Sequence, residues 1–105
     1  MTTGQIQEFT NEIARRFLPE RIILFGSQTS GAAHRDSDVD LLVVMDYEGP
    51  APHKAAEILS SINPDFSVDL LVRKRSELEE RLMLNDFFFR DLLAHGQVMY
   101  EARVA

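Results

Sequence analysis

The chain has 105 residues, which is enough for one domain with a hydrophobic core and too few for two. It contains no cysteine, which excludes a disulfide scaffold and a thiolate metal site, and no apolar run near the roughly 20 residues that cross a bilayer. Its formal net charge of −6 disfavours direct polynucleotide binding, because proteins that grip a phosphate backbone carry a basic stripe. With no signal-peptide pattern at the N-terminus, we expect a single cytoplasmic domain over residues 1–105 without membrane contact.

The first quarter of the sequence predicts a helix followed by a buried strand. Apolar residues recur at helical spacing behind a capping-box pattern at Thr2-x-x-Gln5, and the helix is expected to run to about Phe17 and stop near Pro19. The short β-branched run at residues 21–25 (RIILF) then predicts a strand buried in a core.

The next segment begins with a sharp break at Gly26-Ser27. Ser27 suits the N-cap of a short helix closed by Gly31. After an acidic start, residues 39–45 are apolar on both alternating faces, which predicts an interior strand covered on both sides.

The second half predicts three helices and two strands from caps, breakers and periodicity. They are a helix from Pro52 to about Ile62, a strand at residues 67–72, a helix opened by a capping box at Ser76-x-x-Glu79, a helix from Asn85-Asp86 to a C-cap at Gly96, and a strand at residues 98–100.

The order α-β-α-β-α-β-α-α-β predicts an α/β (α+β) sandwich, with a single small mixed sheet and helices mainly on one face. Alternating helices and strands ordinarily indicate a parallel sheet. The crossovers here are short, so a mixed sheet fits equally well.

Three aspartates on two of these strands carry the candidate chemistry. Asp38 and Asp40 point the same way because residues i and i+2 of a strand share a face, and their backbones lie roughly 6–7 Å apart. Asp69 joins them if the third strand lies beside the second. Three converging carboxylates repel one another at neutral pH unless a cation sits among them, and Mg²⁺ prefers such oxygen ligands.

Gly26-Ser27 supplies the complementary half of the site. A glycine lets the backbone approach a ligand closely, and the free N–H groups of the following turn with the Ser27 hydroxyl form a small anion site. A nucleoside triphosphate between this turn and two metals would be poised for in-line displacement. Asp38 and Asp40 would hold both metals, while Asp69 would hold one and accept a proton from the attacking hydroxyl.

Each feature also has a structural explanation when taken alone. A Gly-Ser pair after a strand is a common turn, and an aspartate that begins a strand often caps the preceding turn. Asp69 interrupts an otherwise apolar strand, where a buried charge without a partner costs several kcal/mol. Such an aspartate more often has a structural partner than a metal. The combination, in this order along the chain, favours a functional site.

Taken together, these residues resemble the nucleotidyltransferases of the DNA polymerase β superfamily, in particular its minimal nucleotidyltransferase branch. The resemblance rests on Gly26-Ser27, on Asp38-x-Asp40 followed by Leu-Leu-Val-Val, on the strand with Asp69, and on the closing segment at residues 95–100. It implies a polymerase β-like fold, ATP as substrate with Mg²⁺ at a two-metal site, and transfer of a nucleotidyl group to a hydroxyl. It also implies an antitoxin that adds AMP to a tyrosine of a HEPN-type ribonuclease toxin.

The loop after Ser27 departs from the family pattern. The family often has Gly-Ser-x-Ala-Arg-Gly, whereas this chain has Gln28-Thr29-Ser30-Gly31 and lacks the basic residue near the phosphates. Arg35 or the cluster at residues 73–75 could replace it, although a solvated turn explains those residues as well. An antitoxin that acts by binding alone is therefore the alternative hypothesis, and an enzyme with a small-molecule acceptor is a third. A homo-oligomer is compatible with each.

Two features near the C-terminus are open to more than one explanation. Arg90 and His95 have the spacing used by HEPN-type ribonucleases, but those proteins are all-helical, so the spacing is interpreted as coincidence. The three phenylalanines at 87–89 cannot all face one side of a helix, so one ring is expected at the surface. It marks a partner surface or packs under a loop.

Overall fold

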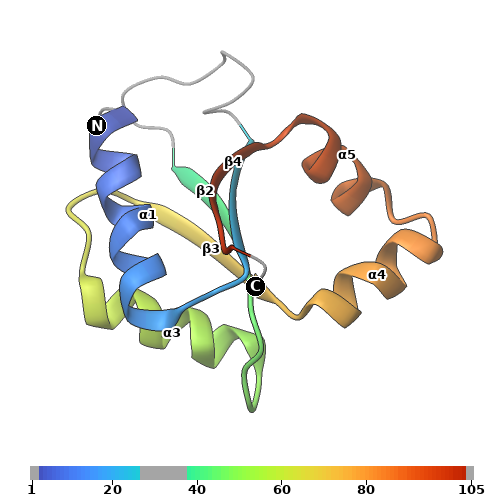
Figure 1. The fold of residues 1–105 in the computed structure, drawn as a ribbon, viewed down its shortest axis with the longest axis horizontal. Coiled ribbons are helices and arrows are strands. Elements are labelled where there is room, and N and C mark those ends of the chain that lie inside the picture. The colour runs from blue at the N-terminus through green and yellow to red at the C-terminus, as the bar shows by residue number, and fades with distance from the viewer. Residues whose placement is uncertain (1–2, 27–37, 104–105) are drawn as a thin grey trace.

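The computed structural model describes residues 3–26 and 38–103, which form a four-stranded sheet with helices packed against it (Figure 1). The described elements are α1 (Thr3–Phe17), β1 (Arg21–Phe25), β2 (Val39–Val44), α3 (Ala51–Ile62), β3 (Val68–Arg73), α4 (Arg75–Met83), α5 (Phe87–His95) and β4 (Gln97–Glu101).

The sheet has the strand order β3-β2-β1-β4, with β3 and β4 at its edges. β1 pairs antiparallel with both β2 and β4, whereas β2 and β3 are parallel and joined through α3. The expected small mixed sheet is therefore confirmed. β3 lies beside β2, the condition for Asp69 to approach the other two aspartates.

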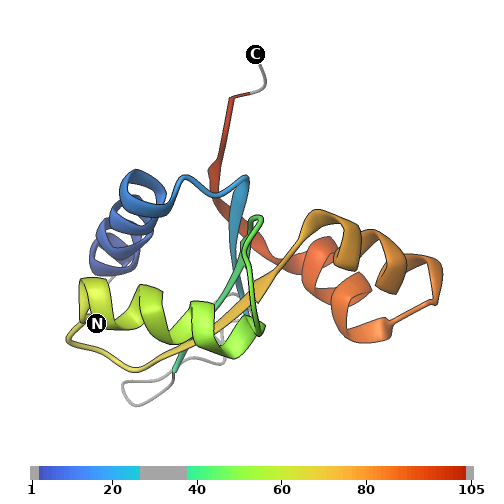
Figure 2. The ribbon, with the colours of Figure 1, turned by 90° about the horizontal axis from the view of Figure 1, so that it is seen from below.

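Helices pack on both faces of this sheet (Figure 2). α1 and α3 cover one face, with the larger core beneath them, so the described helices are divided between the two faces rather than gathered mainly on one as expected. α4 and α5 cover part of the opposite face over a smaller cluster made of Ile23, Leu42, Val44, Leu78, Phe89 and Leu92.

Local signals predicted several element boundaries correctly. β1 spans residues 21–25 as expected, and α1 ends at Phe17. The Asp86 carboxylate caps α5 by accepting hydrogen bonds from the backbone N–H groups of Phe88 and Phe89, at 3.0 and 3.3 Å. Gly96 follows α5 as its C-cap. The proposed cap at Thr2 lies outside the described residues.

The predicted capping box at Ser76 and Glu79 is wrong. α4 begins at Arg75, and its N-cap is Lys74. The Lys74 backbone N–H donates to Glu77 Oε1 at 2.9 Å, and the Tyr47 hydroxyl donates to the same oxygen at 2.7 Å. β3 continues to Arg73, so the chain enters the helix earlier than the Ser-x-x-Glu pattern indicates.

Within the part of the chain that the structure describes, no helix combines the length and the apolar character required to cross a membrane.

Candidate active site

The ends of three neighbouring strands bring Phe25, Asp40 and Asp69 into one row. Asp40 is paired with Phe25 of β1 on one side and with Asp69 of β3 on the other. Paired residues share a face of the sheet, and so do residues two apart in a strand. Ile23 and Leu42, in the next row, belong to the core beneath α4 and α5. The row of Asp40 therefore faces the same side as α5.

Gly26 packs directly against the carboxylate of Asp40. The residue has a φ of +78°, a backbone conformation that side chains with a Cβ rarely adopt. A Cβ at this position would lie 2.3 Å from Asp40 Oδ2 and 3.1 Å from its Cγ. Only glycine leaves this carboxylate where it is. The sequence had indicated a tight turn and an approach to a ligand, and the structure adds this contact.

The three aspartates interact electrostatically. Partial burial of Asp40 raises the pKa of its carboxyl group, and the negative charges of Asp69 and Asp38 raise this pKa further. Asp38 is exposed and directly precedes β2. No Lys or Arg within residues 3–26 and 38–103 forms an ion pair with any of the three. Among the described residues, therefore, the negative charges at this end of the sheet have no cationic side chain paired with them.

Asp69 is not buried, which corrects the expectation for its strand. β3 is an edge strand, and the Asp69 side chain is exposed at one end of it. Because the carboxylate is not buried, it does not need a bound metal to offset the cost of burying an unpaired charge. The exposure instead leaves the carboxylate accessible to a substrate from solvent.

The donors fit a hard divalent cation in kind, although their side chains are not gathered around one point. Among the described residues, no group of three or more Asp, Glu, His or Cys side chains is close enough to hold a metal ion. The charges of Asp38 and Asp69 still raise the pKa of Asp40 at this separation, because Coulomb interactions reach well beyond the distances between a metal ion and its ligands. Asp38 and Asp69 are both exposed, so their side chains have room to turn toward a shared cation. Ser27 lies outside the described residues.

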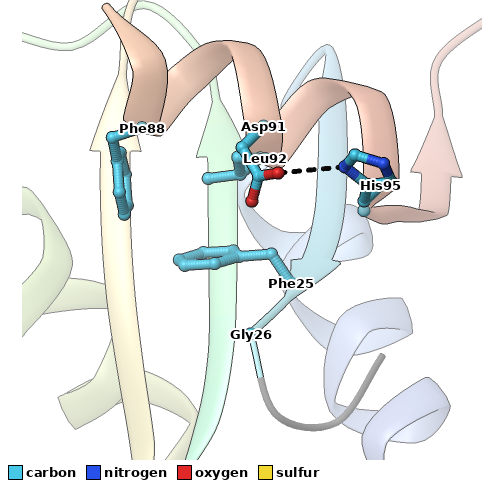
Figure 3. Close-up of a pocket in the computed structure, with 7 residues that line it drawn as sticks. Phe25, Gly26, Phe88, Asp91, Leu92 and His95 are labelled. Atoms are coloured by element: carbon cyan, nitrogen blue, oxygen red, sulfur yellow. Dashed lines mark hydrogen bonds and ion pairs between the residues drawn. The ribbon is translucent and has the colours of Figure 1, made fainter. Parts of the chain in front are cut away.

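A cleft of about 660 Å³ adjoins the carboxylates, and sequence patterns did not predict it. We call it the α5 cleft, and the described residues that line it are Phe25, Gly26, Phe88, Asp91, Leu92, His95 and Gly96. Figure 3 shows Phe25 reaching from the end of β1 toward α5, with Phe88 opposite it and the Asp91–His95 pair on the helix above. Because Phe25 is paired with Asp40, the cleft opens beside the row of aspartates.

The chain matches the nucleotidyltransferase domain family over residues 6–96, and it belongs to that family. No curated protein matches it. Solved structures with the same fold include a putative nucleotidyltransferase from Sulfolobus solfataricus, with 21% identity and a TM-score of 0.64 over 93% of this chain and 78% of that one.

Two further structures with this fold are toxin–antitoxin proteins. One is a toxin–antitoxin with AMP-PNP, with 21% identity and a TM-score of 0.58 over 92% of this chain and 74% of that one. The other is a mutant of the toxin–antitoxin MntA-HpeT, with 18% identity and a TM-score of 0.56 over the same shares of the two chains.

Proposed function

We propose that this nucleotidyltransferase is a cytoplasmic antitoxin of the minimal nucleotidyltransferase branch. It transfers AMP from ATP to a hydroxyl group, that of a tyrosine, on a HEPN-type toxin partner. The observation that carries the proposal is the row of Asp40 and Asp69, with Asp38 two residues before Asp40 and Gly26 packed against the Asp40 carboxylate.

The similar solved structures support both the nucleotide and the kind of partner. One toxin–antitoxin with the same fold was solved with AMP-PNP, an ATP analogue. Another is a mutant in which two aspartates separated by one residue are replaced by glutamate. That spacing is the spacing of Asp38 and Asp40 in this chain.

The proposed reaction is an attack by the acceptor hydroxyl oxygen on the α-phosphorus of ATP. A phosphorus–oxygen bond forms to the acceptor, the bond between the α-phosphorus and the bridging oxygen breaks, and pyrophosphate leaves. The exposed carboxylate of Asp69 accepts the hydroxyl proton. Asp38 and Asp40 orient the triphosphate opposite the turn at Gly26, the residue before Ser27 in the chain. Mg²⁺ held by the three aspartates would supply the positive charge that lets carboxylates and phosphates meet.

The test is transfer of label from ATP carrying ³²P in its α-phosphate. The protein is incubated with Mg²⁺ and the purified product of the adjacent gene, and we expect the partner to become labelled. Replacing Asp38 and Asp40 together by asparagine, or adding EDTA, should abolish labelling. Asp46→Asn is the matched control, because this exposed aspartate follows the opposite end of β2. Absence of label on a partner whose toxicity the chain neutralises would refute the transfer.

Neutralisation by contact alone is the second candidate, and an exposed apolar surface favours it. Met83, Leu84 and Phe87 flank the turn between α4 and α5, with 85%, 64% and 79% of their surfaces exposed. If contact suffices, the double asparagine variant still protects cells from the toxin. If transfer is needed, that variant binds the toxin without protecting.

A further inference from the structure

Phe88 presents an exposed ring at the α5 cleft and is held in place by two other rings. It is 51% exposed, whereas the neighbouring Phe89 is buried. The ring centroid of Phe88 lies 5.8 Å from that of Phe25 and 5.1 Å from that of Phe89, both in edge-on geometry. Such contacts fix an aromatic side chain without covering it. A ring held in this way is ready to stack with a planar ligand.

The size and polarity of the α5 cleft suit an organic ring system. Its volume of about 660 Å³ is in the range of small-molecule sites, and most of its lining is apolar. Among the described residues, the polar side chains at the cleft are Asp91 and His95, joined by a hydrogen bond of 3.0 Å. The carboxylate of Asp91 would repel a phosphate group here. An uncharged aromatic group therefore fits the cleft better than the phosphates do.

The position of the cleft links it to the proposed reaction. Gly26 is part of its lining and also packs against Asp40. Phosphates at the aspartates would thus place the remainder of a nucleotide next to Phe25 and Phe88. Stacking on an aromatic side chain is open to every base, because each base has a π-face.

We propose that the α5 cleft binds the nucleobase of the nucleoside triphosphate, with Phe88 as the stacking surface. The proposal rests on the nucleotidyltransferase function proposed above, and it adds the part of the nucleotide that the aspartates do not contact. Because stacking supplies the contact, discrimination between adenine and guanine should be weak.

The test compares two probes, AMP-PNP and inorganic tripolyphosphate, by calorimetric titration in the presence of Mg²⁺. Phe88→Ala should weaken AMP-PNP binding about tenfold, as expected for one lost stacking contact, and leave tripolyphosphate binding unchanged. Phe88→Trp should restore AMP-PNP binding. Phe87→Ala is the control, because Phe87 is an exposed neighbour that does not line the cleft. This variant should bind both probes as tightly as the parent chain does.

The outcomes separate this inference from the proposed function. Unchanged AMP-PNP binding in Phe88→Ala would overturn the nucleobase site and leave the transferase proposal standing. If Phe88→Ala weakens the binding of both probes equally, the role of Phe88 is structural, and the nucleobase site is overturned as well. If the parent chain binds neither probe, both proposals fail. Phe88→Leu keeps apolar packing against Phe25 and gives the same comparison if the alanine variant does not fold.

Discussion

Replacing Gly26 by alanine should damage the site far more than it damages the fold. The added methyl group meets Asp40 Oδ2 at 2.3 Å, so the carboxylate must move away from its present position. The backbone φ of +78° adds strain of about 1–2 kcal/mol for a residue with a Cβ. Because Oδ2 is the end of a side chain, moving it costs little stability, and the backbone strain dominates the loss in folding free energy.

The two effects differ in size enough to be separated. A domain with a folding free energy of about 5 kcal/mol that loses about 2 kcal/mol is still about 99% folded. The folded fraction therefore cannot explain a large loss of activity. A displacement of about 1 Å in a catalytic group can cost about 100-fold in rate. We expect Gly26→Ala to lower AMP transfer by about that factor.

Gly49→Ala is the matched control, because Gly49 has a φ of +76° but a Cβ added to it would meet no atom of the described residues within 4 Å. Thermal unfolding should give similar melting temperatures for the two variants. Each should lie below that of the parent chain by about 4–8 °C for every kcal/mol of folding free energy lost. Transfer of α-³²P label should be normal in Gly49→Ala and strongly reduced in Gly26→Ala. Equal activity of the two variants, each compared with the parent chain, would refute the contact between Gly26 and Asp40 as the reason for the glycine.

Two further predictions concern pH and helix capping. Burial and the charges of Asp69 and Asp38 raise the pKa of Asp40 above 3.8 in the folded state, so its contribution to stability is present below that value and is lost as pH rises through the raised pKa. Asp40→Asn has no carboxylate to ionise at this position and so avoids this loss of stability. In EDTA at pH 7, the variant should therefore have a higher melting temperature than the parent chain. A lower melting temperature would contradict the repulsion between Asp40 and the other two aspartates. Glu77→Ala should cost about 1 kcal/mol in urea unfolding, because it removes the acceptor at the start of α4, whereas Glu79→Ala should cost almost nothing. Equal losses would contradict the assignment of Glu77 as the capping side chain.

Features that depend on near neighbours in the chain were predictable from the sequence alone. The β-branched run of β1, its break at Gly26 and the start of a helix at Asn85-Asp86 were all predicted, because their causes lie within a few residues. The two-residue spacing of Asp38 and Asp40 is of the same kind. These local patterns were sufficient to indicate the family, to which the match over residues 6–96 assigns the chain.

Local patterns failed where a second segment determined the result. Ser76 and Glu79 have the spacing of a capping box, but β3 continues to Arg73 and brings Lys74 and Glu77 to the start of α4 instead. Tyr47, 30 residues earlier in the chain, completes the hydrogen bonding of Glu77. The sequence of residues 74–79 alone does not indicate the hydrogen bond between Tyr47 and Glu77.

The environment of the aspartates depends on the assembled fold. The apolar neighbours of Asp69 suggested burial, but the strand order leaves β3 at an edge and its aspartate exposed. Strand register brought Phe25 beside Asp40, and the return of α5 over the sheet brought Phe88 to Phe25. Burial and charge interactions depend on what packs across space. The aspartates could therefore be named from the sequence, whereas the exposure of Asp69, the raised pKa of Asp40 and the α5 cleft required the fold.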